Sequence, residues 1–294
     1  MLECEILTKN SKSKGSILQT LKALLEFHYH QRNCADELSL SRPDPLWVAK
    51  NYTQSPYFDE IALICALLSY GNAKMIVQTL QKLDFSLLES PQLNTIDSAE
   101  FPYYRFQTAC DIREIFIIMS KIIAQGGIKQ YFVDSYKHTP KYLLKSWNLS
   151  SNPTHCRMIF AIFSCIQKLR SLQTYASKGL DFLIGKPFVF DSPYTQKLKN
   201  TSPLKRWNMY LRWLVRCDEI DMGFWNDQIQ PSSLILPLDT HTFALCHQLK
   251  ILSRKSYDLQ SALMATDSLI KIDKDDPIKY DFALYRLGQF KILS

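Results

Sequence analysis

Glycine is scarce in this chain, with 8 residues among 294. Barrels and sandwiches built from many short strands use glycine repeatedly at their turns and bends, so this composition argues against both. It also leaves no glycine-rich loop of the kind that holds a dinucleotide or a nucleoside triphosphate. We therefore expect a fold other than an all-β fold or a nucleotide-binding α/β fold.

Long apolar runs are also missing. No run reaches the roughly 18 residues that a membrane-spanning helix needs. The first residues, Met1-Leu-Glu-Cys-Glu5, are acidic where a secretory signal would be basic. These features predict a cytoplasmic protein with no membrane partner.

The 8 cysteines form no Cys-x-x-Cys pair, and most lie in apolar helical patterns such as Ile64-Cys65-Ala66. This spacing is typical neither of a disulfide framework nor of a zinc site. The histidines His241 and His247 are six apart, which places them on opposite faces of a helix. We expect reduced core thiols, no metal and no cofactor.

The formal net charge is +7, from 35 basic and 28 acidic residues. A basic excess suits a polyanionic partner such as nucleic acid better than an acidic one. Many soluble proteins carry a similar excess without binding nucleic acid, so the charge alone leaves both interpretations open.

Apolar residues recur at helical spacing through most of the chain. No segment alternates in the manner of a strand, so the sequence predicts an all-α fold. The expected irregular connections are residues 41–57, 86–102, 179–203 and 218–238. The expected helices are 17–32, 59–83 with a break at Ser69-Tyr-Gly-Asn72, 109–123, 129–137, 140–146, 155–178, 205–216, 239–249, 259–272 and 277–290.

Two sequence motifs carry the strongest functional signal: Lys205-Arg-Trp-Asn-Met-Tyr-Leu211 and Leu236-Pro-Leu-Asp-Thr-His-Thr242. They resemble the catalytic words of the helix-hairpin-helix DNA glycosylases, K-T-A-N-V-V-L and V-D-T-H-I. Lys205, Asn208 and Leu211 match the first word at offsets 0, +3 and +6. Upstream, Ile64-Cys-Ala-Leu-Leu-Ser69 is similar to the family's helix that leads into its DNA-probing loop. The 34-residue interval from Lys205 to Asp239 is most similar to that of the archaeal 8-oxoguanine branch.

The resemblance implies a role for each matched segment. Two helical lobes would be formed by residues 1–58 with 218–294 and by residues 59–217, with the active site in the cleft between them. The implied partner is double-stranded DNA with a damaged base, bound by a monomer associated with the nucleoid. The implied site residues are Lys205 and Asp239 for catalysis; Ser69, Tyr70, Gly71, Asn72, Lys199, Ser202, Arg206 and Lys255 for DNA binding; and Trp207, Trp213, Asp281 and Tyr285 for the base pocket.

The implied chemistry is base excision. A deprotonated lysine amine attacks the anomeric carbon of the damaged nucleotide, and the Schiff base that results permits strand cleavage by β-elimination. The aspartate accepts a proton or stabilises positive charge on the sugar. The base must first be flipped out of the duplex. The resemblance thus implies a glycosylase with abasic-site lyase activity.

The chain departs from the glycosylase pattern at several points. The family's glycine hairpin before the lysine is replaced by Lys199-Asn-Thr-Ser-Pro-Leu204. No cysteine follows Cys246, so the iron–sulfur cluster of the endonuclease III branch is absent. Shifting the match by two residues would put Trp207 at the lysine position, as in monofunctional alkylation glycosylases. The match at Asn208 favours Lys205.

Each candidate also has a simpler interpretation. Asp239 before Thr-His-Thr is a typical helix N-cap. Lys205 fits a solvated first turn, Trp207 and Trp213 fit a core, and the basic set from Lys197 to Arg216 fits a solvated helix face. Two other functions therefore stay open, namely a DNA-binding protein without catalysis and a helical protein-interaction module. The motifs Arg206-x-Asn-Met-x-Leu-Arg-Trp213 and Asp276-Pro-x-Lys-Tyr-Asp-Phe-Ala-Leu284 resemble those of a bacterial family of conserved hypothetical proteins, and this resemblance covers about residues 45–290.

Overall fold

The computed structural model describes residues 14–39, 41–89, 93–146, 150–188 and 201–289. Within these ranges the regular secondary structure is helical, and there is no β-strand. The all-α fold class predicted from scarce glycine and helical spacing is confirmed.

The chain divides into two compact units, each built from segments that are distant in the sequence. The unit that we call terminal comprises Met1–Glu37, Trp147–His155 and Gln196–Ser294. The unit that we call central comprises Leu38–Ser146 and Cys156–Thr195. Against the boundaries expected from the sequence, residues 38–58 lie in the central unit, and residues 150–155 and 201–217 lie in the terminal unit.

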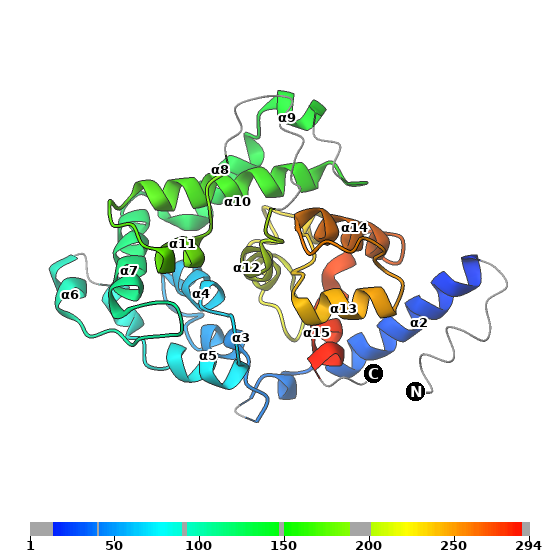
Figure 1. Cartoon of the computed structure of the whole chain (residues 1–294), viewed down its shortest axis with the longest axis horizontal. Helices are drawn as coiled ribbons and strands as arrows, with labels where there is room; N and C mark the ends of the chain where they lie inside the picture. Colours follow the sequence, from blue (N-terminus) through cyan, green and yellow to red (C-terminus); the bar gives the residue numbers. More distant parts are fainter. Residues whose placement is uncertain (1–13, 40, 90–92, 147–149, 189–200, 290–294) are drawn as a thin grey trace. The chain divides into compact units, whose positions relative to one another are not determined.

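Helices α3 to α11 build the central unit (Figure 1). Helix α4 is buried along nearly its whole length, and it packs against α3, α7 and α8. The first two residues of α10 belong to the terminal unit. The elements are α3 (Pro45–Lys50), α4 (Phe58–Leu67), α5 (Ala73–Leu80), η2 (Phe85–Leu88), α6 (Leu93–Ser98), α7 (Ala109–Ile123), α8 (Gly127–Lys137), α9 (Lys141–Ser146), α10 (Thr154–Ser171) and α11 (Lys178–Ile184).

A buried carboxylate fixes the start of α8 in this unit. Glu60 of α4 accepts a hydrogen bond from the Ile128 backbone N–H at 2.7 Å. Gly127, with φ 85°, leaves room for that carboxylate, because a Cβ there would lie 3.1 Å from Glu60 Oε1. Burial raises the pKa of Glu60 to about 7. Glu60 thus replaces the partner that the first turn of α8 would otherwise find in water.

The terminal unit combines the N-terminal helix with the C-terminal third of the chain. Helix α15 packs against both α13 and α2. Gly288 of α15 allows close approach, because a Cβ there would lie 3.4 Å from the His241 carbonyl. The elements are α2 (Lys14–Arg32), η1 (Ala35–Glu37), α12 (Lys205–Val215), η3 (Pro231–Ser233), α13 (Thr240–Gln248), α14 (Leu259–Ile270), η4 (Pro277–Tyr280) and α15 (Asp281–Gln289).

Several predicted boundaries are confirmed, and each has a local cause. Helix α7 covers the predicted 109–123 and begins with a capping box between Thr108 and Asp111. The predicted break at 69–72 separates α4 from α5, and Asn72 caps α5 by accepting from the Lys74 and Met75 N–H groups. Side-chain caps of this kind fix where a helix begins.

Two other predictions, for residues 41–57 and 155–178, were wrong. Residues 41–57 were expected to be extended, yet α3 begins at Pro45 with Asp44 as its N-cap. Proline is well suited to the first helical position, where its missing N–H costs nothing. Residues 155–178 were expected as one helix, but α10 ends at Ser171 and a second helix, α11, begins after Ser177, whose hydroxyl caps it by accepting from the Leu180 N–H.

None of the helices in these ranges combines the length and the apolar character that a bilayer crossing requires. Among the same residues, no three histidine, cysteine or acidic side chains are grouped as a metal ion would need. The cysteines there are free; four are buried as expected, at positions 65, 156, 165 and 246, whereas Cys110 and Cys217 are exposed.

Candidate functional site

Lys205 is the first residue of α12, and the backbone before it turns sharply without a glycine. Leu204 takes a left-handed conformation with φ 55°. Such a conformation costs an ordinary residue on the order of 1 kcal/mol, so the surroundings must hold it. The buried Asn208 side chain donates to the Pro203 carbonyl at 3.0 Å, and its backbone N–H donates to the Leu204 carbonyl at 2.9 Å. Asn208, part of the motif match, therefore positions the turn that presents the half-buried Lys205.

Asp239 is the N-cap of α13, as its simpler interpretation predicts. Its carboxylate accepts a hydrogen bond from the Thr242 N–H at 2.8 Å, and the residue is half-buried. Nearby, the Tyr257 hydroxyl donates to the Leu238 carbonyl at 2.9 Å. Burial raises the pKa of Tyr257 to about 12, and the charge of Asp239 adds to that rise. The carboxylate of Asp239 thus lies close enough to affect this phenol.

Asp281 brings the two catalytic candidates into one electrostatic environment. It is buried at the start of α15 and accepts a hydrogen bond from Arg212 Nη1 at 2.5 Å. Burial raises the pKa of Asp281 to about 6 against the lowering effect of Arg212; Asp239 raises this pKa further and Lys205 lowers it. Both Lys205 and Asp239 therefore lie within electrostatic reach of the same buried carboxylate.

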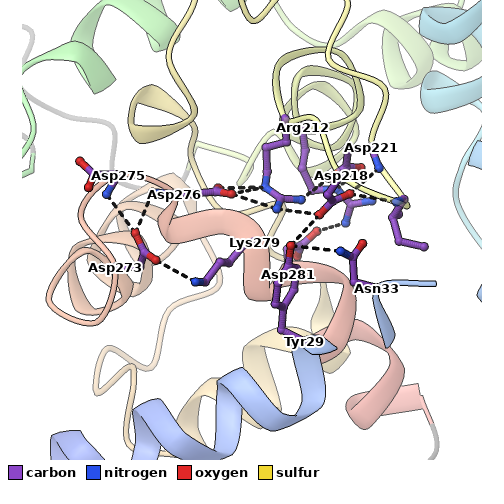
Figure 2. Close-up of polar contacts among 12 residues, drawn as sticks. Tyr29, Asn33, Arg212, Asp218, Asp221, Asp273, Asp275, Asp276, Lys279 and Asp281 are labelled. Atoms are coloured by element: carbon purple, nitrogen blue, oxygen red, sulfur yellow. Dashed lines mark hydrogen bonds and ion pairs between the residues drawn. The ribbon is translucent and has the colours of Figure 1, made fainter. Parts of the chain in front are cut away.

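Arg212 and Arg216 form a buried ionic network with the acidic residues around them (Figure 2). Besides Asp281, Arg212 contacts Asp221 at 3.2 Å. Arg216 also pairs with Asp221, and it donates to Asp218 at 2.8 Å and to Asp276 at 2.9 Å. Each guanidinium thus has several carboxylate partners, as a buried charge requires.

This network corrects the interpretation of the basic cluster. Arg212 and Arg216 were expected on a surface that faces DNA or solvent, but both are almost completely buried. Arg212 lies in the last turn of α12 and Arg216 is its C-cap, with its N–H donating to the Arg212 carbonyl. This four-residue spacing beside buried apolar residues is the signal that predicts burial with acidic partners. Their positive charges pair with buried carboxylates, so these two arginines do not contact the phosphate backbone of DNA.

The tryptophans predicted to stack on a base belong to the core. Trp207 and Trp213 are buried, and the ring of Trp207 lies edge-to-face against Tyr210 at 6.3 Å. A nucleobase could stack on these rings only after the core had opened. Of the remaining pocket candidates, Asp281 is buried as described, and Tyr285 is half-buried beside the guanidinium of Arg286.

The predicted DNA-probing segment lies in the central unit. Ser69 is buried, and its hydroxyl donates to the Cys65 carbonyl at 2.6 Å, so this side chain does not face solvent. Tyr70 is half-buried, whereas Gly71 and Asn72 are exposed. Gly71 has φ 99° and packs against Arg105, whose guanidinium lies 2.6 Å from where a Cβ would be.

The other predicted DNA contacts belong to the terminal unit. Lys199 lies outside the described residues. Ser202 is exposed, and its hydroxyl accepts from the Leu204 N–H at 3.4 Å. Arg206 is half-buried and Lys255 is exposed.

Sequence reasoning missed Asp221 and Tyr257. Asp221 is fully buried, although it lies in a turn-rich stretch whose composition predicts exposed side chains. Tyr257 follows the polar segment Ser253-Arg-Lys-Ser256 and gives no periodic signal. Pairing such residues with their partners requires the tertiary structure.

The chain belongs to the family described as "Protein of unknown function (DUF2400)", whose model matches residues 44–290. The match spans Lys205, Asp239 and Asp281 together. No curated protein matches the chain, and no solved structure matches it.

Proposed function

We propose that this protein is a DNA base-excision glycosylase whose Lys205 forms a Schiff base with the substrate sugar. The proposal unites the motif resemblance with the placement of its two catalytic candidates. Its substrate is double-stranded DNA with a damaged base, and its second step is cleavage at the abasic site.

One observation carries the proposal. Lys205 at the start of α12 and Asp239 at the start of α13 are separated in sequence, yet both helices meet α15: α13 packs against it, and Arg212 of α12 donates a hydrogen bond to its first residue, Asp281. An amine and a carboxylate at two helix starts in one unit form the pair that nucleophilic attack on a sugar carbon requires. The Asn208 hydrogen bond to Pro203 holds the lysine's helix in place.

The proposed reaction begins at C1′ of the damaged nucleotide. The unprotonated Lys205 amine forms a bond to C1′ while the bond from C1′ to the base breaks, and the base leaves with the electron pair. Asp239 stabilises the positive charge that develops on the sugar. The amine then loses a proton, the sugar ring opens, and a Schiff base links Lys205 to C1′.

Borohydride trapping on DNA with a single abasic site tests this proposal. The unmodified chain should form a covalent protein–DNA adduct, because borohydride reduces the Schiff base to a stable amine. Lys205→Gln should abolish the adduct while the protein stays folded, as circular dichroism would show. Lys274→Gln is the matched control, since Lys274 is an exposed lysine of the same unit. Equal trapping by Lys205→Gln and the unmodified chain would contradict the assignment.

A DNA-binding protein without catalysis is the second candidate. It is favoured by the N-cap role of Asp239, because the Thr242 hydrogen bond alone explains an aspartate there. Trapping that fails on every damaged oligonucleotide, combined with salt-sensitive gel shifts, would support this candidate. Absence of any gel shift at low salt would favour the protein-interaction module instead, since phosphate contacts strengthen as salt falls.

A further inference from the structure

Four aromatic rings form an exposed surface on the central unit. Tyr103 is 70% exposed, Phe106 is 61% exposed and Phe182 is 41% exposed. The fourth ring, Tyr70, lies parallel to Phe106 at 5.9 Å with an interplanar angle of 5°. Phe182 of α11 meets Tyr70 edge-to-face at 4.8 Å and Phe106 at 5.5 Å. We call Tyr70, Tyr103, Phe106 and Phe182 the ring surface.

Two loops hold the ring surface in a fixed arrangement. The Tyr70 hydroxyl donates to the Tyr104 carbonyl at 3.2 Å, and the Tyr104 hydroxyl donates to the Tyr70 carbonyl at 2.5 Å. Tyr104 and Gln107 also exchange two backbone hydrogen bonds, which close a two-residue turn. Rings held in this way lose little conformational entropy when a flat ligand stacks on them.

Arg105 gives the ring surface a positive charge. It is the first central residue of the turn and has φ 52°, a conformation that glycine normally supplies at this position. Its guanidinium lies 5.7 Å from the centroid of Tyr70 and 5.6 Å from that of Phe106. The Tyr103 hydroxyl donates to the Arg105 carbonyl, which helps to hold the strained turn.

The charged residue in each of the two loops that carry Tyr70 and Phe106 is basic. Arg105 is the only charged residue between Phe101 and Cys110, and Lys74 is the only one between Ser69 and Gln81. The acidic residue of α11, Asp181, pairs with Arg170. The nearby Asp111 is buried, and its carboxylate accepts hydrogen bonds from Thr108, Tyr175 and Ser177. Exposed rings with a cation among them suit a ligand that combines flat rings with phosphates.

We infer that the ring surface binds unstacked bases of DNA, with Phe106 and Phe182 as stacking partners and Arg105 contacting the backbone phosphate. The inference rests on the proposed function in its choice of DNA as the partner. It assigns a binding role to the central unit, apart from the catalytic candidates of the terminal unit.

Fluorescence anisotropy with a labelled single-stranded oligothymidylate tests the inference. The full chain would carry Lys205→Gln, so that no covalent adduct forms. Phe106→Ala should weaken binding about tenfold, and Phe106→Trp should keep affinity within about twofold, because any large ring can stack. Arg105→Asn should also weaken binding, since asparagine tolerates a positive φ but carries no charge. Phe27→Ala is the matched control, because Phe27 is 59% exposed in the terminal unit.

Three results would overturn the inference. The first is equal oligothymidylate affinity for the double variant Phe106→Ala/Phe182→Ala and its parent. The second is no binding by the parent chain at low salt. The third is a dimer, detected by size-exclusion chromatography, that Phe106→Ala dissociates without changing oligothymidylate binding. The partner of the ring surface would then be a second copy of the chain.

The same measurements separate this inference from the proposed function. Ring-dependent binding without Schiff-base trapping by the unmodified chain would support the inference and contradict the glycosylase. Schiff-base trapping with ring-independent binding would support the glycosylase and contradict the inference.

Discussion

The terminal and central units place the same residue types in opposite environments. In the terminal unit, Arg212 and Arg216 are buried among carboxylates and the tryptophans form the core. In the central unit, an arginine and three aromatic side chains lie on the surface, and the buried Glu60 has a backbone N–H as its partner. The position of a residue in its helix or turn therefore determines its role more than its chemical type.

This difference changes where function should be sought. The motif resemblance directed attention to Trp207 and Trp213 as stacking rings and to the basic residues of α12 as phosphate contacts. The structure instead exposes rings at Tyr103 and Phe106 in the other unit. In the terminal unit, the surviving catalytic candidates are the two helix-start residues, Lys205 and Asp239.

The largest expected effect tests the buried network. Arg212→Ala should lower the free energy of unfolding by about 3–5 kcal/mol, because the buried Asp221 and Asp281 would lose a charged partner. Phe106→Ala in the central unit should cost less than about 1 kcal/mol, since its ring is exposed. Urea unfolding followed by circular dichroism measures both. Similar losses for the two variants would remove the contrast between the units.

The pH dependence of stability should have opposite signs at one buried group of each unit. Burial lowers the pKa of His155 in the terminal unit from 6.5 to about 4. The unfolded chain then binds the extra proton between these values, so this contribution to stability is lost as pH falls from 6.5 towards 4. Burial raises the pKa of Glu60 from 4.5 to about 7, so stability is lost there as pH rises through that interval.

Each pH effect should reach on the order of 3 kcal/mol over its full interval. Glu60→Gln should gain stability relative to the parent chain as pH rises from 4.5 to 7, and His155→Gln should gain as pH falls from 6.5 to 4. Urea unfolding of both variants across this range measures the slopes. Parallel pH profiles for each variant and its parent would show that these two groups do not titrate as the structure implies.

Comparing two capping aspartates of the terminal unit tests whether Asp239 has a catalytic role besides its role as a helix cap. Asp239 caps α13 and Asp258 caps α14, each through its Oδ1 to a backbone N–H three residues on. Asparagine is nearly as good a cap, so both Asp→Asn variants should stay folded. Asp239→Asn should slow base removal about 10²-fold or more, as removal of a transition-state charge does. Asp258→Asn should remove bases at the rate of the unmodified chain. Equal rates of base removal for the two variants would show that Asp239 serves only as a helix cap.

Much of the fold follows from the sequence because its determinants are local. The capping box at Thr108 and the apolar spacing of 109–123 define α7, and the break at 69–72 marks the turn between α4 and α5. The start of α3 was missed because proline was read as a breaker, although Pro45 follows the N-cap Asp44. Proline breaks a helix in its interior but is well suited to its first position, and composition alone does not tell these two positions apart.

The site was only partly predictable for a different reason. Lys205, Asp239 and Asp281 were found through motif words and one late acidic residue. Their shared environment depends on contacts between α12, α13 and α15, which are distant in sequence. Burial of Trp213, and the left-handed turn at Leu204 in place of a glycine hairpin, also depend on tertiary packing.

The smallest expected effect concerns the surface charge that remains in the terminal unit after its buried arginines are excluded. Arg206→Ala and Lys255→Ala should each weaken duplex binding to a similar extent for unrelated sequences, because phosphate contacts carry no base information. Each should also reduce the slope of log affinity against log salt by about one unit, since one fewer counterion is released. Anisotropy titrations at several salt concentrations measure this slope, with Lys274→Ala as the exposed-lysine control. An unchanged slope in both variants would mean that neither residue contacts phosphate, and duplex binding would then have to rely on other cations of the chain.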